Sequence, residues 1–239
     1  MLELHQFKNS PYCLKVRMAL AAKKLKYRTV EITPAIGQID IFQKTGQRKL
    51  PVLFDNEITI HNSSSIIRHL EKIQIEPKLI PDNPKERSQA QIIENWADTT
   101  LAKSIKIVFL EEIMKSPALI SSLLSNEISD SMQNFFVNMP LNIATQISGL
   151  LNQEDKESLK LNLDYLTNLV EKENFLVGKE LSIADIAVAS QLSLLSFPNS
   201  SGKTLKGKGC SIYFNDPSLK NLFKWRDSIE DKLITTNLK

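Results

Sequence analysis

The chain has 239 residues, enough for one large domain or two modest ones, each with its own core. Apolar residues make up 42% and charged residues 24%, and a net charge of +3 provides no concentrated basic face for nucleic acid. The two cysteines, Cys13 and Cys210, exclude a disulfide framework and a multi-cysteine metal site and favour a reducing compartment. With no secretory signal and no apolar run of membrane-spanning length, we expect a cytoplasmic protein without membrane partners.

The first eighty residues alternate between strand and helix patterns. Strands are predicted over residues 2–7, 27–32, 52–54 and 58–60, and helices over residues 11–24, 36–44 and 63–72. In the first helix Cys13, Val16 and Leu20 share an apolar face, and we expect Lys15 and Lys23 to lie away from it. A strand–helix–strand unit favours a parallel pair and a close strand pair favours a hairpin. The pattern therefore predicts a mixed sheet with helices on both faces, as in the α/β thioredoxin arrangement.

Residues 77–83 include two prolines and are typical of a linker. After this segment strand patterns nearly vanish. A long helix is predicted over residues 84–115, with one apolar side formed by Ile92, Trp96, Leu101, Ile105 and Phe109. Further helices are predicted over residues 118–125, 129–137, 141–151, 154–173, 182–195 and 217–233, and a Gly- and Ser-rich loop over residues 198–214. We therefore expect two domains, residues 1–76 and 84–239, the second of them all-helical.

The segment Ser10-Pro11-Tyr12-Cys13 lies between the first predicted strand and helix. A side chain there faces the free N–H groups of the helix N-terminus, which favour a thiolate. The Ser10 hydroxyl can stabilise a bound thiolate by a hydrogen bond and lower its pKa, or it can simply cap the helix. Cys13 follows the apolar register, so it is either a packed core residue or a single redox thiol.

Two further segments have the features of a ligand-binding edge. Pro51 opens a predicted strand, where its missing N–H is tolerated. Asn62 and Ser63 begin a helix, whose free N–H groups make a ready carboxylate site. In the second half, Ser182 and Asp185 have the spacing of a capping box ahead of an apolar helix, a structural feature.

These segments resemble the glutathione S-transferase superfamily. Ser-Pro-Tyr-Cys resembles the Cys-Pro-Tyr-Cys motif of glutaredoxins with its first cysteine replaced, and the Ser-x-x-Cys motif of several glutathione transferases. The stretch TGQRKLPVL, residues 45–53, is similar to the cis-proline segment of both groups. The box of Ser182 and Asp185 resembles the folding motif of the glutathione-transferase helical domain. The resemblance implies a thioredoxin-like domain that binds glutathione, followed by a helical domain.

The resemblance also implies a role for each residue of the binding edge. Pro51 takes the place of the cis-proline, Leu50 pairs its backbone with the peptide ligand, and Lys49 is a candidate for the glycyl carboxylate. Ser63 is assigned the γ-glutamyl carboxylate. Asn62 departs from the acid or glutamine of the family, and we expect it to accept only a weaker hydrogen bond from the ligand amino group.

The function implied by the resemblance is a transferase reaction of the detoxification type, in a homodimer that uses glutathione as co-substrate and no metal. Ser10 would activate the glutathione thiol for attack on a small hydrophobic electrophile held near residues 105–109. Two alternatives stay open. One is a glutathione-dependent thiol reductase that uses Cys13. The other is a non-catalytic binding or interaction protein with this fold, suggested by Asn62 and by the Gly- and Lys-rich loop of residues 202–209.

Overall fold

The computed structural model describes residues 1–32, 49–116, 119, 122–123 and 153–234. The chain divides into two compact units. The first comprises Met1–Glu94, Val177–Ser190 and Ile229–Lys239, and the second comprises Asn95–Leu176 and Gln191–Ser228. The helices predicted over residues 36–44, 129–137 and 141–151, and most of the one over 118–125, fall outside the described residues. The domain boundary expected at residues 77–83 stays a prediction.

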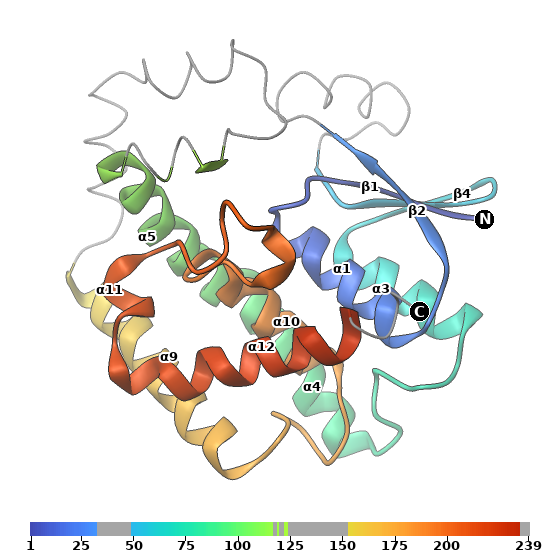
Figure 1. The fold of residues 1–239 in the computed structure, drawn as a ribbon. Helices are drawn as coiled ribbons and strands as arrows, with labels where there is room; N and C mark the ends of the chain where they lie inside the picture. Colours follow the sequence, from blue (N-terminus) through green and yellow to red (C-terminus); the bar gives the residue numbers. More distant parts are fainter. Residues whose placement is uncertain (33–48, 117–118, 120–121, 124–152, 235–239) are drawn as a thin grey trace. The chain divides into compact units, whose positions relative to one another are not determined.

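One mixed sheet forms the centre of the described part of the first unit (Figure 1). Its strands are β1 (Leu2–Gln6), β2 (Tyr27–Glu31), β3 (Val52–Asp55) and β4 (Ile58–His61), in the order β2-β1-β3-β4. The pair β1–β2 is parallel, and the pairs β1–β3 and β3–β4 are antiparallel. The predicted parallel pair and hairpin are both confirmed.

Two helices accompany this sheet, α1 (Pro11–Ala22) and α3 (Ser63–Ile73). They lie side by side, and α3 contacts β3 and β4 (Figure 1). Pro11 occupies the first turn of α1, where its missing N–H has no helical partner to lose. Leu4 and Leu53, which face each other across the β1–β3 pair, are fully buried in the core.

The expectation that Lys15 and Lys23 avoid the buried face of α1 was wrong. Lys15 is 0% exposed and Lys23 is 2% exposed. Each ammonium group is buried because a partner reaches it from another segment of the first unit. Lys15 pairs with Glu94, whereas Lys23 pairs with Glu71 and donates to the carbonyl of Ile75.

The predicted long helix is interrupted by a π-helical turn. It consists of α4 (Pro84–Trp96), the π turn η1 (Ala97–Leu101) and α5 (Ala102–Lys115). A π turn accommodates an extra residue and rotates the helix face that follows it. Ile105 and Phe109 are buried as expected, whereas Ile92 is 68% exposed, so the predicted apolar side does not extend to Ile92.

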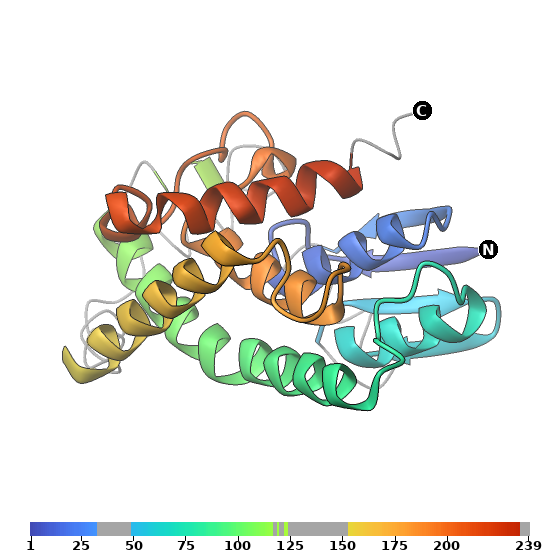
Figure 2. The same cartoon turned by 90° about the horizontal axis from the view of Figure 1, so that it is seen from below.

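The remaining described elements are also helical. They are α9 (Gln153–Lys172), α10 (Ile183–Gln191), η2 (Leu192–Leu194), η3 (Asn199–Ser201), α11 (Ser211–Phe214), η4 (Pro217–Leu219) and α12 (Lys220–Ile234). In the second unit α9 packs along α5, as Figure 2 shows. The loop expected over residues 198–214 contains the short helices η3 and α11. Within the described chain, no helix combines the length and apolarity that a membrane span requires.

Candidate functional site

The sheet register brings three separate segments to one edge of the first unit. His5 on β1 pairs with Val52 on β3, and Val52 pairs in turn with His61 on β4. Neighbouring strands are about 4.8 Å apart. The end of β1, the beginning of β3 and the end of β4 therefore lie together, and they carry Ser10, the Leu50–Pro51 bond and Asn62.

Ser10 stands at the N-cap of α1 with an extended backbone. Its N–H donates to the carbonyl of Phe7 at 2.9 Å, and its carbonyl accepts from the N–H of Leu14 at 2.9 Å. Its side chain makes no capping hydrogen bond to the helix backbone. The half-buried hydroxyl therefore lies beside the positive end of the helix dipole without being used to cap it.

Cys13 is a core residue of α1 with 0% exposure. Burial raises the pKa of its thiol above the ordinary value, although hydrogen bonds from the Phe7 backbone and the Ser10 side chain act in the opposite direction. A reactive thiol needs exposure and a lowered pKa. Cys13 has neither property. It is buried and its pKa is raised, as expected for a packed, protonated thiol.

The Leu50–Pro51 peptide bond is cis, the isomer that the resemblance implied for this position. Pro51 is buried, and Leu50 packs against the core pair of Ile32 and Val52. In the described part of the chain, no backbone hydrogen bond uses the N–H or carbonyl of Leu50. Its backbone can therefore pair with an extended peptide, as in strand addition. Lys49 is exposed beside it.

Asn62 adopts a backbone conformation that few residues other than glycine tolerate, with φ 70° and ψ 128°. Such conformations cost about 1–3 kcal/mol and gather at ligand-binding corners. The Asn62 side chain caps α3, because its Oδ1 atom accepts from the N–H groups of Ser64 at 2.9 Å and Ser65 at 3.4 Å. Those two donors are therefore occupied, and a carboxylate here would use the N–H and hydroxyl of Ser63.

A buried ionic cluster supports the first turn of α3, and the sequence analysis missed it. The Lys15 Nζ atom lies 2.7 Å from Glu94 Oε1 and 3.0 Å from Ser64 Oγ. Arg68 approaches the other Glu94 oxygen at 3.6 Å. No local sequence signal revealed it, because the burial of Glu94 and Ala90 on α4 is visible only in the structure. A carboxylate in such a place requires a cationic partner.

Ser182 and Asp185 make the contacts of a helix cap at the start of α10. Asp185 Oδ2 accepts from the backbone N–H of Ser182 at 2.8 Å and from its hydroxyl at 2.9 Å. The Ser182 hydroxyl oxygen also accepts from the N–H of Ala184 at 3.3 Å. The N–H of Ile183 donates to the carbonyl of Leu79 at 2.8 Å, which fixes this helix start to the segment after α3.

The expected electrophile position near residues 105–109 stays a prediction. Ile105 is fully buried, and Phe109 packs edge-on against Phe197 with ring centroids 5.6 Å apart. Val108 lines a cavity within the second unit. Over the described ranges, no three His, Cys, Asp or Glu side chains form a group that could hold a metal ion.

The mixed sheet in the order β2-β1-β3-β4, with α1 and α3 beside it, is that of a thioredoxin-like domain. Residues 4–78 match the family model of the glutathione S-transferase N-terminal domain. A glutathione S-transferase from Rhodospirillum rubrum has a TM-score of 0.64 and 23% identity, covering 96% of this chain and 88% of that chain. A delta-class glutathione transferase from Nilaparvata lugens has a TM-score of 0.68 and 17% identity, covering 98% and 90%. The predicted thioredoxin-like domain followed by a helical domain is confirmed.

The chain thus matches the glutathione S-transferase N-terminal domain over residues 4–78, and its likeness to these solved structures shows the fold of the rest. Among curated proteins it is also similar to FtsZ-localized protein A of Caulobacter vibrioides. The two are 23% identical over 198 residues, which cover 81% of this chain and 77% of that relative.

Proposed function

We propose that this protein binds glutathione at the edge formed by Ser10, Leu50 and Ser63 and activates its thiol for attack on a small electrophile. The observation that carries the proposal is the sheet register, which brings the ends of β1 and β4 beside the beginning of β3. A thiol peptide laid across this edge meets a hydroxyl at a helix N-terminus, the backbone of Leu50 and a second helix N-terminus.

Ser10 acts on the thiol in this proposal. Its hydroxyl makes no capping bond to the helix backbone and lies at the N-terminus of α1. A hydroxyl donor and a helix dipole both favour a thiolate over a thiol, so they lower the pKa of a bound thiol. The thiolate is the nucleophile that attacks the electrophile.

The peptide is held by main-chain pairing and by its two carboxylates. The N–H and carbonyl of Leu50, which make no backbone hydrogen bond within the described residues, pair with its backbone, and the exposed Lys49 side chain faces the glycyl carboxylate. Ser63 receives the γ-glutamyl carboxylate at the start of α3. Asn62 offers the ligand no negative charge, so we expect weaker glutathione binding than an acid would give.

Purified full-length protein tests the proposal. We expect retention on immobilised glutathione and turnover of a chromogenic aromatic electrophile. Ser10→Ala should lower the rate about a hundredfold, the scale of losing one oriented hydrogen-bond donor to a developing or bound anion. Ser88→Ala, on the exposed surface of α4, is the matched control and should leave the rate unchanged. Absence of both retention and turnover contradicts the proposal.

A non-catalytic binding role is the second candidate. Its support is that residue 62 is an asparagine, whose side chain caps α3. This position therefore offers no acid to the ligand amino group. The likeness to a protein named for its localisation with FtsZ supports it further. This candidate predicts no turnover with any electrophile and no rise in melting temperature with glutathione. The reductase alternative draws no support from the burial of Cys13.

A further inference from the structure

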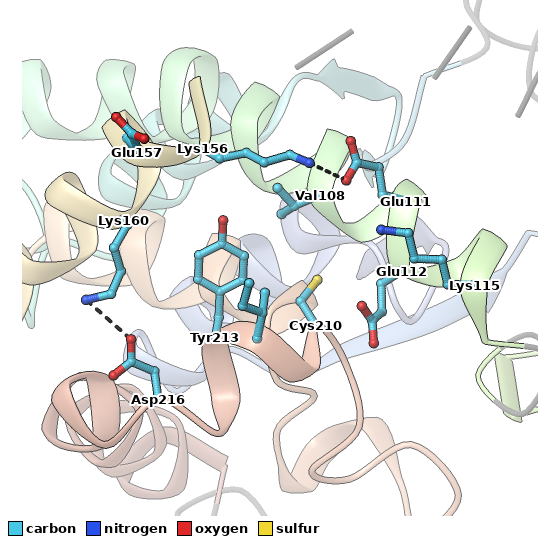
Figure 3. A pocket seen from close by; sticks show the side chains of 11 residues that line it. Val108, Glu111, Glu112, Lys115, Lys156, Glu157, Lys160, Cys210, Tyr213 and Asp216 are labelled. Atoms are coloured by element: carbon cyan, nitrogen blue, oxygen red, sulfur yellow. Dashed lines mark hydrogen bonds and ion pairs between the residues drawn. The ribbon is translucent and has the colours of Figure 1, made fainter. Parts of the chain in front are cut away.

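A cavity of about 380 Å³ lies within the second unit, between α5, α9 and α11. Figure 3 shows that its lining side chains come from these three helices and the residues beside them. Cavities of a few hundred cubic ångströms are the usual size for small-molecule sites. The residues proposed above to hold glutathione do not line it, so its ligand need not be a thiol peptide.

One wall of the cavity is apolar. Val108 contributes from α5, and Cys210, Ile212 and Tyr213 contribute from α11 and its start. The Tyr213 ring projects toward Val108 and Lys156 (Figure 3). Burial raises the pKa of Tyr213 to about 12, with smaller contributions from Cys210 and Glu111. Burial also raises the pKa of the Cys210 thiol, so this wall stays uncharged at neutral pH.

The cavity also holds a buried carboxylate with an unused oxygen. Glu111 is 8% exposed, and its Oε2 atom accepts from Lys156 Nζ at 2.8 Å, as drawn in Figure 3. Within the described segments, its Oε1 atom is buried and has no hydrogen-bond partner. A buried polar atom of this kind is normally satisfied by a partner, which a bound donor would supply.

The lysines around the cavity do not provide that donor. Lys156 already pairs with Glu111, and Lys160 pairs with Asp216 at 3.3 Å and donates to Ser218 at 2.9 Å. Lys115 is exposed. Among the residues that line this cavity and that the structure describes, the buried atom without a partner is therefore an acceptor, Glu111 Oε1.

The electrostatic field at Cys210 also favours a positively charged ligand. After burial, Glu112 and then Glu111 are the next causes that raise the pKa of the Cys210 thiol, which means that both carboxylates disfavour a further negative charge there. Glu112 accepts from the Ser211 hydroxyl at 3.0 Å through one oxygen. A cation with N–H donors fits this field better than an anion.

We propose that this cavity binds an organic ammonium ion with an aromatic or aliphatic body. The ammonium group donates to Glu111 and lies close to Glu112, and the body packs on Val108, Ile212 and Tyr213. The aromatic face of Tyr213 adds attraction for the cation. Its lining residues are not those of the proposed glutathione site, and it binds its ligand without glutathione.

Three probes with the same phenyl body and different charge test this site: phenethylamine, phenethyl alcohol and hydrocinnamate. Each is titrated into the isotope-labelled full chain without glutathione and followed by NMR. Phenethylamine should shift resonances of residues 210–216 and bind at least about tenfold more tightly than the alcohol, the difference expected for one charge-assisted hydrogen bond. Hydrocinnamate should bind more weakly still. Equal binding of all three probes, absence of binding, or shifts confined to other residues overturns the proposal.

Charge-removing variants provide the matched comparison. Glu111→Gln should weaken phenethylamine binding about tenfold, whereas Glu173→Gln, at an exposed position beyond the end of α9, should leave it unchanged. If Glu111→Gln does not fold, Ile212→Trp serves instead. Ile212 is 75% exposed, so a larger side chain there can obstruct the cavity without repacking the core, and it should abolish binding. Unchanged phenethylamine binding in the folded variant contradicts the site.

Discussion

The ammonium group of Lys15 lies 2.7 Å from a carboxylate oxygen of Glu94, and the two side chains are 0% and 4% exposed. The residues are 79 positions apart and come from α1 and α4. Lys15 also reaches the Ser64 hydroxyl in the first turn of α3. One buried cation thus connects three helices of the first unit beneath the proposed ligand edge.

Removing only one partner of this pair should be costly. Lys15→Met is expected to lower the free energy of unfolding by about 3–5 kcal/mol, because it leaves the Glu94 charge buried. Replacing both residues, by Lys15→Met and Glu94→Leu together, should restore most of that loss. Urea denaturation measures both. Arg68→Met, at an exposed cation near Glu94, is the control and should cost less than about 1 kcal/mol. Equal losses in the single and double variants would contradict this account.

The cap of α3 by Asn62 has a matched comparison in the same unit. Asn83 caps the start of α4 in the same way, with Oδ1 accepting from the N–H groups of Lys85 and Glu86. Both Asn→Ala variants lose a cap worth about 1 kcal/mol. Asn62→Ala should cost about 1 kcal/mol more than Asn83→Ala, because asparagine tolerates a positive φ better than alanine. The account of Asn62 is wrong if chemical denaturation shows equal losses.

Cys13 and Cys210 should be inert in the folded protein. Both are buried, and burial raises both thiol pKa values. Iodoacetamide at neutral pH should therefore label neither thiol in native protein and both in denaturant, as intact mass shows. Because the raised folded pKa values keep both thiols protonated, their contribution to stability is present below pH 9 and declines as the pH rises further. Rapid native labelling of Cys13 would instead favour the reductase alternative.

Gly209 should be the glycine least tolerant of a side chain in its loop. It has φ 146°, and a Cβ atom there would lie 2.4 Å from the carbonyl oxygen of Leu195. Gly209→Ala should lower the free energy of unfolding by about 2–4 kcal/mol, because the close contact and the positive φ both disfavour a side chain. Gly207→Ala has open space and only its positive φ, so about 1 kcal/mol is expected. A ranking in the opposite order by thermal unfolding would contradict the loop geometry.

The sheet could be predicted from sequence because its signals are local. Each strand is a short β-rich run, and Pro11 fixes the start of α1 through its own covalent geometry. The meeting of Ser10, Leu50 and Asn62 could be expected only from the family resemblance. Strand register, which brings them together, is set by contacts between distant segments.

Of the features missed from the sequence, the burial of the lysines on α1 depends on long-range partners. The burial of Lys15 needs Glu94, and a single helix sequence cannot reveal a partner 79 positions away. The π turn at Ala97–Leu101 was also missed, because no residue there is one that forces such a turn. The capping role of Asn62 was also not foreseen, because the resemblance directed its side chain to the ligand.

The most direct test of the proposed site is an NMR titration of the labelled full chain with reduced glutathione. The account predicts that chemical-shift changes concentrate in three segments far apart in sequence, around Ser10, Leu50 and Ser63, and that they saturate. Ser10→Ala should retain this pattern while raising the pKa of the bound thiol. No saturable change in these segments, or changes centred elsewhere, would contradict the claim that this edge of the sheet is a thiol-peptide site.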